Sequence, residues 1–129
     1  MLFFALELDE QRIKEDHIVN PDAAWQTIEE TFAQRDVTFH HSEGNIRYYT
    51  RNIDKHDFEY LWMVNMAMEK EVWFRYYIKT WMYIDIDDDT NELYEDEDLL
   101  DEPDMVFDRP TKEQLEQARI QHFQEKGNT

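Results

Sequence analysis

Thirteen acidic residues lie between Asp85 and Asp108, and no lysine or arginine separates them. They are Asp85, Asp87, Asp88, Asp89, Glu92, Glu95, Asp96, Glu97, Asp98, Asp101, Glu102, Asp104 and Asp108. The rest of the 129-residue chain holds 18 acidic and 13 basic residues, so it carries a net charge of -5 against -13 for this acidic segment. Because ionised carboxylates are rarely buried without partners, the acidic side chains of residues 85–108 are expected at the surface.

Long blocks of like charge are typical of disordered tails, but this block contains apolar side chains that can anchor it to a folded domain. They are Leu93, Tyr94, Leu99, Leu100, Met105, Val106 and Phe107. We therefore expect an ordered acidic surface and not a tail. The chain length fits one domain over residues 1–129, with one hydrophobic core.

The net charge of -18 repels nucleic acid phosphates and anionic lipid headgroups, so we expect neither direct nucleic acid binding nor membrane binding. The apolar run Leu2–Leu6 is followed by Glu7, too early for a membrane span or a signal peptide. The sequence contains no cysteine, which fits a reducing compartment. We expect a cytoplasmic protein with a basic protein as its partner.

The first half of the chain gives clear secondary-structure signals. Residues Leu2–Leu8 alternate in polarity and predict a strand. Asn20 is a suitable N-cap for a helix over Pro21–Arg35, in which apolar residues recur every three or four positions. The β-rich runs Val37–His41 and Asn45–Arg51 then predict a hairpin, with a glycine in the connection between them.

The stretch Phe58–Met68 is ambiguous, because its apolar residues recur at period two while its composition also suits a helix. We favour two long paired strands, over 58–68 and 74–84. A final helix is expected over 111–126, where Thr111 and Gln114 form a capping-box pair. The result is an α+β fold with a mainly antiparallel sheet of four to five strands in the order β-α-β-β-β-β-α. If 58–68 is helical, the order becomes βαββαβ, a ferredoxin-like arrangement.

Several reaction classes require residues that this chain lacks. Its only glycines, Gly44 and Gly127, cannot form a glycine-rich phosphate loop. Its only serine, Ser42, has none of the flanking glycines of a nucleophile elbow. We therefore expect no catalytic residues and no cofactor, and we predict that the protein is not an enzyme.

No metal site is predicted either. His40 and His41 are adjacent, so in a regular strand they point to opposite faces and cannot chelate one ion. The other three histidines are scattered: His17, His56 and His122. We expect surface or structural roles for all five.

The acidic segment partly matches a calcium-binding loop. Asp85, Asp87 and Asp89 occupy alternating ligand positions, and Asp96 stands at the twelfth position. However, Thr90 takes the place of the usual glycine, and the twelfth residue is not the usual glutamate. A negative surface that attracts cations weakly is the better interpretation.

Aromatic residues beside the acids indicate a protein-binding surface, in which anchors give affinity and charges give steering. The predicted partner-binding residues are Asp85, Asp87, Asp88, Asp89, Glu92, Glu95, Asp96, Glu97 and Asp98, with Tyr94, Trp81 and Tyr83 as outward-facing anchors. We expect an acidic inhibitor, such as an immunity protein or antitoxin that occupies the cationic surface of a basic toxin or nuclease. The alternatives are a DNA-mimic protein of a phage or mobile element and an acidic secretion or assembly chaperone.

Overall fold

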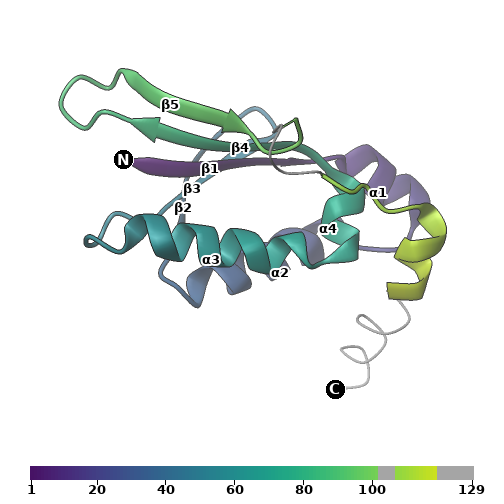
Figure 1. The fold of residues 1–129 in the computed structure, drawn as a ribbon. Coiled ribbons are helices and arrows are strands. Elements are labelled where there is room, and N and C mark those ends of the chain that lie inside the picture. Colours follow the sequence, from purple (N-terminus) through teal and green to yellow (C-terminus); the bar gives the residue numbers. More distant parts are fainter. Residues whose placement is uncertain (102–106, 119–129) are drawn as a thin grey trace.

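The computed structural model describes residues 1–101 and 107–118, and it shows an α+β fold with one five-stranded antiparallel sheet (Figure 1). The strands are β1 (Leu2–Leu8), β2 (Thr38–Glu43), β3 (Ile46–Thr50), β4 (Ile78–Ile86) and β5 (Leu93–Asp98). The helices are α1 (Glu10–Asp16), α2 (Pro21–Ala33), α3 (Asp57–Glu69) and α4 (Val72–Tyr77), and residues 112–118 are also helical. The sheet order is β2-β3-β1-β4-β5.

The expected class, α+β with an antiparallel sheet, is confirmed, but the expected strand over 58–68 is wrong. Residues Asp57–Glu69 form α3, and the expected strand over 74–84 begins only at Ile78, after α4. The alternative βαββαβ order is therefore the one found, with β5 added at the sheet edge. The short helix α1 was not expected.

The outer surface of α3 explains the error. Its buried residues, Leu61, Val64 and Met68, follow the spacing of a helix. Phe58 and Met66 are apolar as well but are about half exposed. These exposed apolar residues fill in the alternation of the sequence, so that a helix with apolar groups on both sides imitates a strand of period two.

The predicted helix caps and the predicted turn at Gly44 are confirmed. The Asn20 side chain accepts hydrogen bonds from the first backbone amides of α2, as expected. At the last helix, the backbone N–H of Thr111 donates to the Gln114 side chain at 2.9 Å, and the N–H of Gln114 donates to Thr111 Oγ1 at 3.2 Å. Gly44, with φ at +60°, turns the chain between β2 and β3. Residues 119–126 of the expected helix lie outside the described residues, as do Glu102 and Asp104 of the acidic segment.

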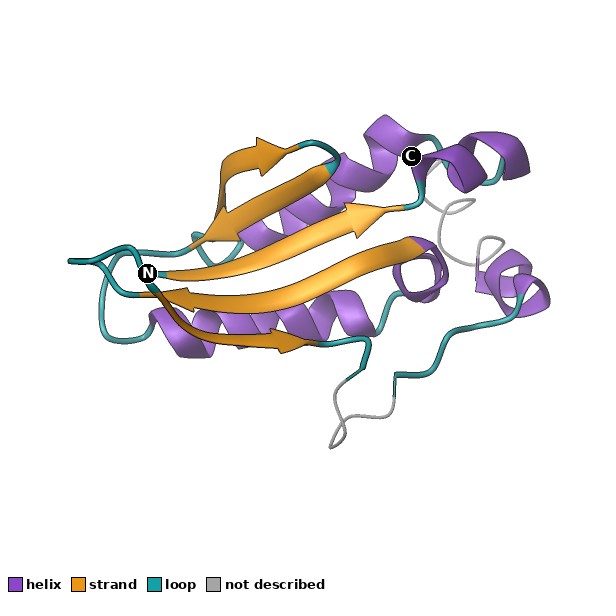
Figure 2. Cartoon of the chain, turned by 90° about the horizontal axis from the view of Figure 1, so that it is seen from above, coloured by secondary structure: helices purple, strands orange, loops and turns teal. Residues whose placement is uncertain are grey.

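The helices pack against one face of the sheet and leave the other face uncovered by any described helix (Figures 1 and 2). In the central strand β1, Phe4, Leu6 and Leu8 point into the hydrophobic core beneath the sheet. Phe3 and Ala5 point the opposite way, to what we call the open face. The fully buried large side chains are mostly aromatic: Trp73, Trp81, Tyr49, Tyr77, Phe4, Phe32 and Phe74.

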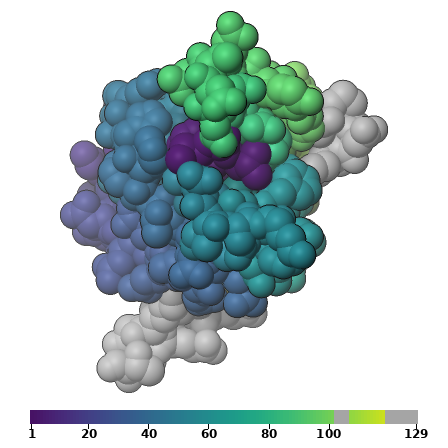
Figure 3. Space-filling view, turned by 90° about the vertical axis from the view of Figure 1, so that its left-hand side faces the viewer, coloured from purple at the N-terminus to yellow at the C-terminus, as the bar shows by residue number. Residues whose placement is uncertain are grey.

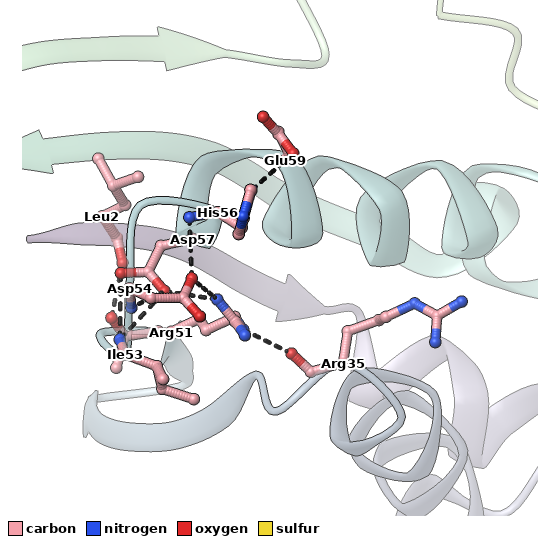
Figure 4. Close-up of polar contacts among 9 residues, drawn as sticks. Leu2, Arg35, Arg51, Ile53, Asp54, His56, Asp57 and Glu59 are labelled. Atoms are coloured by element: carbon pink, nitrogen blue, oxygen red, sulfur yellow. Dashed lines mark hydrogen bonds and ion pairs between the residues drawn. The ribbon is translucent and has the colours of Figure 1, made fainter.

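A buried arginine fixes the connection between β3 and α3 (Figure 4). Arg51, 6% exposed, donates from Nη1 to Asp57 at 2.7 Å and to Asp54 at 3.0 Å. Its Nε donates to the backbone carbonyl of Arg35 at 2.9 Å, and its guanidinium lies 4.4 Å from the centroid of the Tyr60 ring. One cation therefore ties the turn after α2, the β3–α3 connection and the first turns of α3 together.

Replacement of Arg51 by methionine is expected to lower the thermal midpoint by on the order of 10 °C, because the Asp57 carboxylate loses its cationic partner and the Arg35 carbonyl loses the donor that Arg51 supplies. Differential scanning calorimetry measures the change. Lys55→Met is the control, since it removes an exposed positive charge from the same connection. Equal midpoints for the two variants would contradict the structural role of Arg51.

Candidate protein-binding surface

Nine of the acidic residues lie on the hairpin formed by β4, β5 and the turn between them. The hairpin stands out from the body of the molecule at one end of the sheet (Figures 1 and 3). Strand β5 pairs with β4 on one side only, because it is the last strand of the sheet. The acidic hairpin, residues 85–98, is thus an edge of the sheet and not part of its interior.

The turn of the acidic hairpin has a defined hydrogen-bonded conformation. Asp87 Oδ1 accepts from the backbone N–H groups of Asp89 at 2.9 Å and Thr90 at 3.0 Å. The Asp87 N–H donates to the carbonyl of Glu92 at 2.9 Å, and Asn91 takes a left-handed backbone conformation with φ at 57°. Because Thr90 and Asp89 donate to its ionised form, the pKa of Asp87 lies below its ordinary value of 3.8.

The carboxylates of β5 lie on both faces of the sheet. Asp96 is opposite Ile84 and therefore on the open face, whereas Glu97 is opposite Tyr83 and on the helix-covered face. Glu95 is directly opposite Asp85. Like charges in this position repel each other and destabilise the pairing. Edge strand β5 therefore carries negative charge on both faces of the sheet.

The carboxylates of the hairpin also affect the pKa of the buried Tyr83 side chain. Burial, together with the carboxylates of Asp85, Glu95 and Glu97, raises its pKa to about 12. The phenol stays protonated at neutral pH. By register, these three carboxylates lie on the same face of the sheet as Tyr83.

The expectation that Trp81 and Tyr83 face outward is wrong. The two residues are 1% and 4% exposed, because their register with Leu6 and Phe4 in β1 directs them toward the helices. The exposed apolar groups of the hairpin lie instead on β5, where Leu93 is 59% and Tyr94 is 77% exposed. Of the three expected anchors, only Tyr94 is accessible to a partner.

The sequence interpretation missed a further exposed aromatic residue beside the hairpin. Phe58 of α3, 52% exposed, contacts both Trp62 and Tyr83, with ring centroids 6.1 Å apart in each case. Trp62 and Tyr83 also pack together, at 5.6 Å. This group of edge-to-face and tilted aromatic rings reaches from β4 to the surface of α3. The sequence signal for this contact was the spacing of four residues between Phe58 and Trp62. That spacing places two side chains next to each other only in a helix.

The expectation that His40 and His41 point to opposite faces is also wrong. A β-bulge inserts His40 between Phe39 and His41, the partners of Tyr49 and Tyr48. Side-chain alternation breaks at such a bulge. Both imidazoles therefore lie on the open face, with their Nδ1 atoms 2.8 Å apart.

Two pockets in the described part of the chain lie away from the acidic hairpin. One of about 410 Å³ is lined by the junction of α1 and α2, including Ile13, His17 and Asn20. Another of about 200 Å³ lies beside Arg51, whose charge is already paired. Within residues 1–101 and 107–118, no three His, Asp or Glu side chains converge as metal ligands would.

Comparison with known proteins gave no family. No protein-family model matches the chain, and neither a curated protein nor a solved structure resembles it significantly. None of the described helices combines the length and apolar character that crossing a membrane requires.

Replacement of Asp87 by alanine is expected to accelerate hydrogen exchange at the Thr90 amide by about tenfold, because its hydrogen-bond acceptor is lost. NMR-detected exchange measures the rate. The stabilisation should be present above the unfolded-state pKa of about 3.9 and lost as the pH falls through the lower folded-state pKa.

Asp89→Ala is the control for that measurement, because the Asp89 side chain is exposed and does not accept from Thr90. Unchanged exchange at Thr90 in the Asp87 variant would show that the turn does not depend on this carboxylate.

Proposed function

We propose that this protein binds the cationic surface of a basic protein with its acidic hairpin and thereby inhibits it, as an immunity protein or antitoxin does. One observation carries the proposal: nine carboxylates lie within residues 85–98 of a projecting, hydrogen-bonded hairpin, and this segment contains no lysine or arginine. A cleft that binds phosphate groups attracts an ordered array of carboxylates for the same electrostatic reason.

The positions of the carboxylates on β5 favour binding to a partner over stability of the fold. Asp85 and Glu95 face each other across the strand pair at a cost to stability. A positive partner would remove this repulsion on binding. The same field accelerates association with a cationic surface, toward 10⁸ M⁻¹ s⁻¹ or more at low ionic strength as an order of magnitude.

Exposed apolar groups next to the carboxylates would supply affinity. Tyr94 and Leu93 lie on the hairpin, and Phe58 lies below it on α3. Aromatic side chains of this kind become the dominant contacts when a partner covers them, while the surrounding charges set orientation and rate. The proposed surface therefore combines anchors with an acidic rim.

The resolved pKa shifts favour binding over catalysis. Burial raises the pKa of Tyr83 to about 12, and the amides of Thr90 and Asp89 lower that of Asp87. Both groups move away from neutral pH, whereas a general acid or base needs a pKa near the working pH. A DNA-mimic protein would use the same surface and differ in its target, so identification of the partner separates the two functions.

Affinity capture from native lysate of the source organism is expected to recover a basic protein at about 50 mM salt, and to recover less of it at about 300 mM. Mass spectrometry identifies the captured protein. A variant with Asp89→Asn, Glu92→Gln, Glu95→Gln and Asp96→Asn should lose most of the capture, because it removes four exposed charges from the hairpin.

The matched control changes the same number of exposed charges elsewhere: Glu15→Gln, Asp22→Asn, Glu30→Gln and Glu113→Gln. It should retain capture if the hairpin is the binding surface. Equal losses in both variants would mean that only total charge matters. Recovery of a neutral partner, indifferent to salt, would contradict the proposal.

Tyr94→Ala is expected to raise the Kd of the captured partner at least tenfold through faster dissociation, with little effect on the association rate. Surface plasmon resonance separates the two rates. The carboxamide variant should show the opposite pattern, with slower association and a weaker salt dependence. Ile53→Ala, on the β3–α3 connection and also exposed, is the control. An unchanged dissociation rate for Tyr94→Ala would exclude it as an anchor.

A further inference from the structure

The two histidines of β2 form a constrained pair outside the acidic hairpin. His40 Nδ1 and His41 Nδ1 are 2.8 Å apart, so one nitrogen donates a hydrogen bond and the other accepts it. Both rings contact Phe3 edge-on, at centroid distances of 5.2 Å and 6.2 Å. The bulge between Phe39 and His41 creates this arrangement, because a regular strand would separate the rings.

The His41 ring is held from two further directions. It stacks on Tyr48, with centroids 4.4 Å apart and planes 7° from parallel. Its Nε2 faces Glu43 Oε1 at 3.6 Å. A carboxylate at this position favours the tautomer with hydrogen on Nε2, which leaves the lone pair of Nδ1 available. Metal-ligating histidines characteristically have such a carboxylate behind the ring.

We propose that His40 and His41 form a bidentate site for a transition-metal ion of the copper(II) type, with each imidazole contributing Nδ1. The proposal is independent of the partner-binding function. On binding, the donor ring loses its Nδ1 hydrogen to solvent and takes up a hydrogen at Nε2 in exchange, so that the metal bonds to the Nδ1 lone pairs of two neutral imidazoles.

The separation of the two nitrogens indicates the coordination geometry. Two metal–nitrogen bonds of about 2.0 Å at about 90° place the nitrogens about 2.8 Å apart, as in a tetragonal copper(II) site. A tetrahedral ion such as zinc requires about 3.3 Å for the same bond lengths. The 2.8 Å of the hydrogen bond between the rings therefore needs little change to hold a tetragonal ion and a larger change to hold a tetrahedral one.

Two ligands are fewer than a structural metal site uses, which limits the affinity. Within the described ranges no third His, Asp or Glu joins this pair, so water would fill the remaining positions. Copper(II) binds nitrogen ligands most tightly of the common divalent ions, which makes it the ion best able to use a two-histidine site. Open positions on the ion would be accessible to solvent, because His40 is exposed.

Titration of the full chain with copper(II) chloride, followed by calorimetry and electron paramagnetic resonance, tests the site. One equivalent should bind, with a tetragonal spectrum and electron spin echo modulation from two imidazole nitrogens. His40→Gln and His41→Gln should each lower the affinity at least about tenfold and remove one imidazole signal. Glu43→Gln keeps both ligands and should cause a smaller loss, because it removes only the group that orients His41.

His56→Gln is the matched control, because His56 is another partly exposed histidine beside a carboxylate, Glu59. The carboxamide variant of the hairpin controls for weak cation binding by the acidic surface. Neither should change the affinity or the spectrum. Circular dichroism verifies that each variant is folded. Binding unaffected by His40→Gln, a spectrum without two imidazole nitrogens, or equal losses in His56→Gln would overturn the proposal.

Discussion

The pairing of β5 with β4 is the interaction on which the acidic hairpin depends. Strand β5 has few buried side chains of its own, and its carboxylates repel one another across the pair. Three features oppose this repulsion: the backbone hydrogen bonds of the ladder, Leu99, and the ammonium group of Met1. This ammonium group lies 2.7 Å from Asp88 and 3.9 Å from Asp85. Leu99 is 1% exposed in the core, and its N–H donates to the Trp81 carbonyl at 2.9 Å. The neutral end of the hairpin therefore anchors its charged end.

The charge on β5 also governs what can pair with its free edge. An exposed edge strand is a template for another strand, and natural proteins often protect such edges with charge. A second copy of this hairpin would bring nine further carboxylates against the first nine, so self-pairing is strongly disfavoured. This protection depends on the charge of the approaching segment. A segment rich in lysine or arginine is attracted to the same edge.

Capping and burial patterns predicted the parts of the fold that depend on neighbours in sequence. Asn20 fixed the start of α2, and Thr111 with Gln114 fixed the start of the last helix. The failures arose where tertiary context decides. Phe58 lies on the outer side of α3, in edge-to-face contact with Trp62 and Tyr83, and no local pattern distinguishes this arrangement from strand alternation. The exposed acids were predictable from charge alone, whereas the burial of Trp81 required the register of β4 with β1.

The bulge at His40 shows how one backbone irregularity changes the chemistry that a sequence supports. Two adjacent histidines on a regular strand share no ligand, yet one extra residue brings both rings to the open face. Strands β2 and β5 are the two edges of the sheet, separated by three strands and therefore by roughly 19 Å at the usual spacing. This exceeds the screening length of about 8 Å at physiological salt. An ion held by the histidines would leave the field of the acidic hairpin almost unchanged, so the two surfaces act independently.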